Sequence, residues 1–437
     1  MKHLKKEFWR YMMFAILGMI GSSGTILADT FFVSHRLGSE GLAALNIAIA
    51  IFGLLNGLGM MIGIGGATCY SIYKAQQRHG EANQTFTLSF QMTVGLGCLF
   101  FFMGLYGASG LAKCLGANQD ILPLCTTYLR TILMFAPSFL LNHLFMSFVR
   151  HDGSPQLAML MMISGSLTNI VLDYLFMYPL HMGILGAALA TGLAPTISVF
   201  IACLYIFLQR HGFHLTRTSF QFSQLLTILK PGLSSFINEF SSSLVLVVFN
   251  LLILKLEGHI GVAAYGIVAN LALIVLAIFT GVAQGLQPLL SRAYGQGQSQ
   301  EIQYLYKKGC YVVLSIGICV LCMAYLLSSH LVALFNHENH QTLQLLADEG
   351  MRYYFIGFLF IGYNYLTISL LSTTNQVFSA FRLSLLRGCI GIIMGACLFA
   401  ILWGMTGIWL AFPCVEFITM LIGKFKFSSQ HLLEISK

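Results

Sequence analysis

The chain has 437 residues, of which 57% are hydrophobic and only 9% are charged, whereas a soluble domain carries roughly 25% charged residues. This composition excludes a chain of two or three soluble domains, because the apolar runs reach the length of about 20 residues that crosses a bilayer. The net charge of +8 does not call for a nucleic-acid partner, since most lysines and arginines fall in segments predicted on one side of the membrane.

Apolar runs predict twelve membrane-spanning helices, so the expected fold is an all-α polytopic membrane protein. In chain order, the predicted spans are Trp9–Phe32, Ala43–Tyr70, Phe86–Ala112, Thr126–Val149, Leu157–Tyr178, Gly183–Leu208, Gly232–Leu254, Gly261–Leu289, Gly309–Phe335, Met351–Ser372, Phe381–Gly404 and Thr406–Gly423. The first span follows a basic segment, as a secretory signal does. It continues past Asp29 to Phe31, so we interpret it as a membrane span that is retained.

The distribution of positive charge predicts the orientation. With the N-terminus inside, only five of the 23 lysines and arginines lie on the outer side: Arg36, Lys113, Arg130, Lys255 and Arg352. The other 18, Arg387 among them, are assigned to cytoplasmic segments. This bias predicts that both termini lie in the cytoplasm, and it supports an even number of spans. We expect the chain to reside in the plasma membrane.

An internal repeat relates the two halves of the chain. A shift of 220 residues aligns, without a gap, Gly38 with Gly258, Ala44 with Ala264, Ile47 with Ile267, Gly65 with Gly285, Ser71 with Ser291, Gln76 with Gln296 and Glu81 with Glu301. We therefore expect two six-helix bundles, residues 1–208 and 232–437, related by a pseudo-two-fold axis and joined by a cytoplasmic linker at 209–231. In such parallel repeats the substrate site lies between the halves.

Motifs for enzyme chemistry are absent from the sequence. There is no GxxxxGK[ST] to bind ATP, no GxSxG and no HExxH. His337-Glu338-Asn339-His340 has the wrong spacing for a zinc helix, and Cys319 and Cys322 lie within a span, where cysteine acts as a small apolar residue. We therefore predict no enzyme activity, no cofactor and no metal apart from a transported sodium ion, and transport driven by an ion gradient or by downhill flow.

Four acids fall within predicted spans: Asp29, Asp173, Glu239 and Glu416. An acid at mid-membrane costs about 2.5–3.5 kcal/mol on insertion scales, so such residues usually mark ion or substrate pathways. Asn169 precedes Asp173 by one helical turn on the same face. Two carboxylates that share a pocket are not both ionised cheaply, which favours a proton site, although the same oxygens with an amide and a hydroxyl also suit sodium. A hydrogen-bond network that only locks the helices is the alternative.

Three polar residues of the second half are further candidates for coupling or for substrate binding. Glu239 lies about two turns into the seventh span, beside serines, and Glu416 lies mid-span behind Pro413. Gln284 lies in the eighth span. For Glu239, a local hydrogen bond to a serine is the alternative interpretation.

These residues together resemble the multidrug and toxic compound extrusion (MATE) family over essentially the whole chain. The segments that carry the resemblance are Ala28-Asp29-Thr30-Phe31-Phe32-Val33, Asn169-Ile170-Val171-Leu172-Asp173, Met182-Gly183-Ile184-Leu185-Gly186 with Ala190-Thr191, Gln287-Pro288, Arg387, and Gly407-Ile408-Trp409 with Pro413 and Glu416. The first span lacks a proline and the tenth lacks an acid, so neither a proline-driven bend nor a carboxylate-rich second site is expected.

The resemblance implies a V-shaped antiporter that exports organic, often cationic, drugs against inward sodium or proton flow. It further implies a cation site on Asp29, Asn169, Asp173 and Thr191, and it matches Glu239 to an acid of the C-terminal bundle. The expected partners are small organic substrates and membrane lipid, with no nucleic acid and a monomeric chain. Two other functions stay open: a flippase for lipids or lipid-linked sugars, and a membrane-embedded transferase. The transferase would need a catalytic cluster, but His143 is alone in its span.

Overall fold

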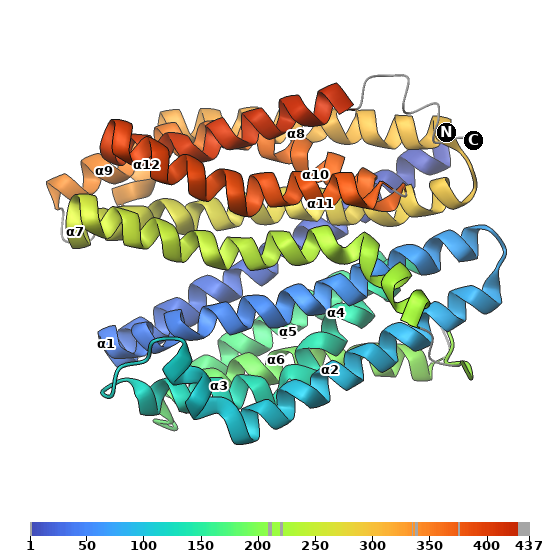
Figure 1. The fold of residues 1–437 in the computed structure, drawn as a ribbon, viewed down its shortest axis with the longest axis horizontal. Helices are drawn as coiled ribbons and strands as arrows, with labels where there is room; N and C mark the ends of the chain where they lie inside the picture. Colours follow the sequence, from blue (N-terminus) through green and yellow to red (C-terminus); the bar gives the residue numbers. More distant parts are fainter. Residues whose placement is uncertain are drawn as a thin grey trace. The chain divides into compact units, whose positions relative to one another are not determined.

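The described part of the fold is built from helices alone. The computed structural model describes residues 2–208, 212–218, 222–333, 335–336, 340–374 and 376–426. The helices, labelled in part in Figure 1, are α1 Lys2–Ala75, α2 His79–Cys114, α3 Leu122–Met134, α4 Ala136–His151, α5 Pro155–Met177, α6 Gly183–Phe207, α7 Phe222–Gly295, α8 Ser299–Ala333, α9 Gln341–Tyr354, the 3₁₀ turn η1 Phe355–Gly357, α10 Phe358–Thr373, α11 Val377–Leu385, the π-helical turn η2 Leu386–Ile390 and α12 Gly391–Lys426. The sequence-predicted His337, Glu338 and Asn339 lie outside the described residues.

The number of spans agrees with the prediction once helix length is considered. Among the described residues, nine helical segments are long and apolar enough to cross a membrane, and α3 with α4 makes a tenth, bent span. Two of the nine segments, Ser223–Gly295 and Val377–Phe425, have 73 and 49 residues, far longer than a bilayer of about 30 Å at about 1.5 Å per residue. Each is broken once by a non-helical glycine, so each holds two spans. The described chain therefore has the twelve spans that we predicted.

Glycines with positive φ make these breaks. The backbone angles are φ 62° and ψ −148° at Gly38, and φ 64° and ψ −152° at Gly258. Gly404 adopts φ 60° and ψ −133°. Only glycine accepts such angles without a steric cost, because it has no Cβ. Gly38 and Gly258 are also the first pair in the 220-residue alignment, so the sequence repeat is visible in the backbone.

The fourth span bends because of a proline. Helices α3 and α4 meet at an angle of 46° around Phe135. Pro137 follows within the first turn of α4, where it has no N–H to donate and its ring crowds the preceding turn. The first span, in contrast, runs from Lys2 to Gly38 without an internal break, as expected for a span without proline.

The chain divides into two compact units that differ slightly from the expected halves. The first unit is Trp9–Phe240, and the second combines Met1–Phe8 with Ser241–Lys437. Within the second unit, Arg292 donates hydrogen bonds of 3.1 and 2.5 Å to the carboxylate of Glu7. The first turns of α7 therefore belong to the first unit, and the first turns of α1 belong to the second.

Candidate functional site

Helix α5 carries two of the predicted site residues on its buried face. Asn169 is 1% exposed and Asp173 is 0% exposed, and their spacing places them one turn apart. Helix α6 packs closely on this face, since a Cβ on Gly165 would lie 2.6 Å from Ser198 Oγ. The carboxylate of Asp173 is therefore held inside the first unit and away from lipid.

Helix α1 contributes a second carboxylate and an unexpected hydroxyl. Thr25 Oγ1 and Asp29 Oδ1 are both buried and have no hydrogen-bonding partner among the described residues. The four-residue spacing places the two oxygens on the same face of α1. A buried polar atom without a partner costs about 1–3 kcal/mol, so this pair of oxygens is the kind of feature that a bound ion or proton compensates. Sequence reasoning did not select Thr25.

The predicted acids lie close together. Asp29 and Asp173 are within electrostatic range of each other. Tyr128 of α3 interacts with both carboxylates, and its hydroxyl is hydrogen-bonded to Thr191 of α6. The Thr191 hydroxyl in turn donates to the carbonyl oxygen of Ala187 at 2.9 Å. Residues from α1, α3, α5 and α6 thus form one cluster, which we call the acid cluster: Thr25, Asp29, Tyr128, Asn169, Asp173 and Thr191.

Tyr128 is a second residue of the acid cluster, after Thr25, that the sequence analysis did not select. It is 4% exposed, and a buried tyrosine usually finds a partner for its hydroxyl. The sequence gives one indication of its importance, which is the position of a hydroxyl-bearing side chain within an apolar span. All the side chains of the acid cluster offer oxygen atoms, which suit a shared proton or a hard cation. Within the described residues, no group of three or more His, Cys, Asp or Glu side chains is placed to hold a metal.

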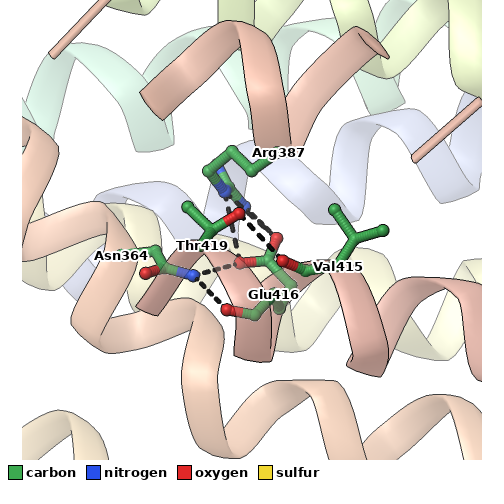
Figure 2. Close-up of polar contacts among 5 residues, drawn as sticks. All are labelled: Asn364, Arg387, Val415, Glu416 and Thr419. Atoms are coloured by element: carbon green, nitrogen blue, oxygen red, sulfur yellow. Dashed lines mark hydrogen bonds and ion pairs between the residues drawn. The ribbon is translucent and has the colours of Figure 1, made fainter. Parts of the chain in front are cut away.

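In the second unit, Glu416 is part of a buried ion pair, which Figure 2 shows. Arg387 donates to Glu416 Oε1 through Nη2 at 2.6 Å and through Nε at 3.0 Å. Asn364 Nδ2 donates to Glu416 Oε2 at 2.7 Å and to the Glu416 carbonyl oxygen at 2.8 Å. The three residues come from η2, α12 and α10, so the network joins three helical segments of this unit.

Arg387 lies inside the second unit. Its side chain is 6% exposed and belongs to the π-helical turn η2; the side of the membrane on which it lies stays a prediction. The guanidinium also stacks on the ring of Tyr365, 4.4 Å from its centroid. Asn364, which binds Glu416, belongs to the tenth span, where the sequence has no acid.

The other two candidates lie in different units. Glu239 is half-buried in the part of α7 that belongs to the first unit, one residue before its end at Phe240. Gln284 is half-buried in the part that belongs to the second unit. The boundary between the units falls within α7 at Phe240 and Ser241, and the break at Gly258 lies further along, inside the second unit. Glu239 was expected in the C-terminal bundle, whereas the division of the structure groups it with the acid cluster; its role stays a prediction.

Comparison with known proteins identifies similar chains and folds. The family model described as MatE matches residues 15–175 and 234–397. Multidrug export protein MepA of Staphylococcus aureus (strain NCTC 8325 / PS 47) is 24% identical over 411 residues, covering 92% of this chain and 89% of that protein. MepA of Staphylococcus saprophyticus is 24% identical over 413 residues, covering 92% and 90%.

Solved structures share the fold. An outward-facing conformation of a multidrug resistance MATE family transporter of the MOP superfamily superimposes with a TM-score of 0.92 at 22% identity, covering 99% of this chain and 96% of that one. A crystal structure of MATE in complex with MaL6 has the same TM-score and identity, covering 99% and 97%. Together with the twelve spans, these likenesses confirm the predicted membrane fold of two helical bundles.

Proposed function

Because the chain belongs to the multidrug and toxic compound extrusion (MATE) family, we propose that its acid cluster carries the ion that drives export. The chain is a multi-pass membrane transporter of the drug-efflux type, as the family and the multidrug export relatives indicate. Family members are transporters and not enzymes. The identity of the driving ion and the residues that bind it are the parts that we propose.

An ion-binding site is required by the energetics of export. Each elementary charge that crosses about 100 mV supplies about 2.3 kcal/mol. At about 1.4 kcal/mol per tenfold, this sustains at most about a fifty-fold substrate gradient per coupled charge. A gradient of this size needs a group inside the membrane that binds the ion on one side and releases it on the other.

The acid cluster supports this role better than any other group of described residues. Asp29 Oδ1 is buried, has no hydrogen-bonding partner within the described ranges and lies within electrostatic range of Asp173. Glu416, in contrast, is already neutralised by Arg387. We propose that Asp29 and Asp173 bind the ion and that Asn169 and Thr191 complete its shell. Both a proton and sodium fit these oxygens, and the experiment below distinguishes the two.

The proposed substrates are bulky, apolar organic cations. The acids lie within membrane spans of a chain that contains 35 Phe and 20 Met residues. Methionine side chains adapt to irregular apolar ligands, and the acids would attract a positive charge. We propose that a single chain binds these molecules in the plasma membrane, without a cofactor or a nucleic acid. Expression in a pump-deficient bacterium tests the substrate class by resistance to cationic dyes. Restored movement of phospholipid or polyprenol-linked sugar without any such resistance would favour the flippase.

The test of coupling is ethidium efflux from vesicles with an imposed sodium gradient or an imposed pH gradient. We expect one of the two gradients to drive efflux in the wild type. Asp29→Asn and Asp173→Asn should each abolish this efflux while the protein stays folded, because an amide has nearly the shape of a carboxylate. Asp120→Asn, in an exposed position between α2 and α3, is the matched control and should transport at the wild-type rate.

The double variant distinguishes one shared site from two separate sites. Since Asp29 and Asp173 belong to one site, the double change should be no worse than either single change. If a proton is the driver, the two acids should titrate jointly. Coupling that survives in Asp29→Asn and disappears only in Glu239→Gln would assign the ion to Glu239 and would refute the acid cluster.

A further inference from the structure

Residues 212–218 of the linker form an extended segment that is bound to the first unit. Residues 212–218 are not helical. Three alternate backbone N–H groups donate hydrogen bonds to side chains: Gly212 to Asp152 Oδ2 (2.6 Å), His214 to Asn83 Oδ1 (3.0 Å) and Thr216 to Thr87 Oγ1 (3.0 Å). Alternate residues of an extended chain point the same way, so one edge of the segment faces the unit along its length.

Three aromatic rings, which we call the aromatic socket, surround the side chain of Phe213, the residue between Gly212 and His214. Phe213 is 1% exposed, and its ring centroid lies 4.6 Å from that of Phe86, 5.8 Å from Phe148 and 6.1 Å from Tyr70. Leu215, two residues further on, is 62% exposed. The segment is therefore anchored at one specific apolar side chain.

Asp152 is held in position to accept a hydrogen bond from the first residue of the segment. Its side chain is 3% exposed, and Oδ1 accepts hydrogen bonds from the Tyr70 hydroxyl at 2.6 Å and from Lys74 Nζ at 2.5 Å. Its second oxygen is thereby aimed at the N–H of Gly212. Tyr70 donates to Asp152 and also lines the aromatic socket. The hydrogen bond of Gly212 and the burial of Phe213 therefore share one residue.

The first part of α7 packs on α1 without side chains between the two backbones. A Cβ on Gly232 would lie 1.9 Å from Met61 O, and a Cβ on Gly65 would lie 2.1 Å from Ile228 O. Small residues permit such close approach of two helices in a membrane. The contact lies within the first unit, which includes α7 as far as Phe240.

A native cysteine lies in this contact. Cys69 is 8% exposed, and its Sγ is 3.6 Å from the carbonyl oxygen of Thr227, to which it donates. The first part of α7 therefore covers Cys69, and the reactivity of this thiol reports whether α7 is in place.

We infer that residues 212–216, which we call the strap, are positioning residues that keep residues 222–240 packed on α1. A free connection from Phe207 to Phe222 extends to about 50 Å, whereas one that begins at a docked Thr216 extends to about 20 Å. Docking thus shortens the tether of α7 and raises the local concentration of its first turns at the surface of α1.

The strap also bears on transport. The chain continues from Phe240 into the second unit, and repeats of secondary transporters move as rigid bodies about the substrate site. A motion of the second unit therefore pulls on residues 222–240, and the docked strap opposes their separation from α1. This consequence for transport rests on the proposed function, whereas the docking itself does not.

The test uses Cys69 as the reporter, in a full-length variant whose other ten cysteines are replaced. N-Ethylmaleimide is added to purified protein in detergent, and alkylation is followed by mass spectrometry. Phe213→Ala, which empties the socket, should increase the alkylation rate about tenfold, which corresponds to about 1.4 kcal/mol. Asn83→Ala, which removes a strap acceptor without touching the socket, should increase the rate as well.

Two matched variants separate release of the strap from general loosening. Phe213→Leu keeps an apolar side chain in the socket and should restore slow alkylation, and Leu215→Ala should react at the wild-type rate. The thermal midpoint of each variant checks that it is folded. Equal rates of Cys69 alkylation in Phe213→Ala and Leu215→Ala would overturn the proposal that the strap keeps residues 222–240 packed on α1. Wild-type protection of Cys69 in a protein that shows no ethidium efflux would refute the proposed function and leave the strap standing.

Discussion

Asp29 and Glu416 are both acids within membrane spans, but their hydrogen bonding differs. Asp29 Oδ1 has no hydrogen-bonding partner in the part of the chain that the structure describes, whereas both oxygens of Glu416 accept hydrogen bonds from Arg387 or Asn364. A carboxylate that is paired with a guanidinium has no need of a further cation or proton. We therefore interpret Glu416 as part of a structural ion pair and Asp29 as the acid that is ready to exchange an ion.

This interpretation predicts an asymmetric effect of mutations on stability. Glu416→Gln leaves the Arg387 guanidinium buried without a counter-charge, and breaking a buried pair in this way costs about 3–5 kcal/mol. Replacing both partners, as in Arg387→Met with Glu416→Leu, should cost much less, because no charge is left uncompensated. Thermal unfolding in detergent measures both variants. A double variant that is as unstable as Glu416→Gln would contradict the structural interpretation.

The helical elements depend on glycines at their breaks, and Gly258 offers a clean test. No atom lies within 4 Å of a Cβ built on Gly258, but its φ is +64°. An added side chain therefore meets only backbone strain, which costs about 1–3 kcal/mol in this region of φ and ψ that is essentially restricted to glycine. Gly266 has the same open surroundings and ordinary helical φ. We expect Gly258→Ala to lower the thermal midpoint and Gly266→Ala to leave it unchanged or raise it. Equal effects of both changes would show that the break needs no glycine.

The elements themselves were largely predictable, because bilayer length, proline and repetition act locally. The span count follows from apolar runs of about 20 residues, and the bend of the fourth span follows from Pro137. The sequence did not predict that Lys2–Ala75 would form an almost continuous helix, since the break at Gly38 takes a single residue where a loop was expected.

The site was predictable only in part, because its remaining contacts depend on packing between helices. Asp29 and Asp173 stand out as charges in apolar spans, whereas Tyr128 and Thr25 look like ordinary span residues until their surroundings are known. The pairing of Arg387 with Glu416 joins residues that are 29 positions apart. The strap was hidden for another reason: its backbone makes the hydrogen bonds, and backbone bonds leave no pattern of residue types.

At the scale of the whole molecule, the chain does not pass from one repeat to the other where the composition changes. The polar linker at 209–231 was the expected joint. In the structure, residues 212–218 of this linker are bound to the first unit, and the division between units falls at Phe240 and Ser241. Since the two repeats of a parallel-repeat transporter enter the membrane from the same side, the strap and both termini should lie on one side.

The side on which they lie is predicted by the charge bias, in which only five of the 23 lysines and arginines lie on the outer side. Positive loops are retained in the cytoplasm, so the strap should be inaccessible from outside the cell. His214→Cys, an exposed position of the strap, is introduced into a cysteine-free chain and treated with a membrane-impermeant maleimide. It should react only after the cells are permeabilised. Gln119→Cys, exposed between α2 and α3 on the predicted outer side, should react in intact cells. Reaction at 214 in intact cells, with none at 119, would invert the topology and place both termini outside.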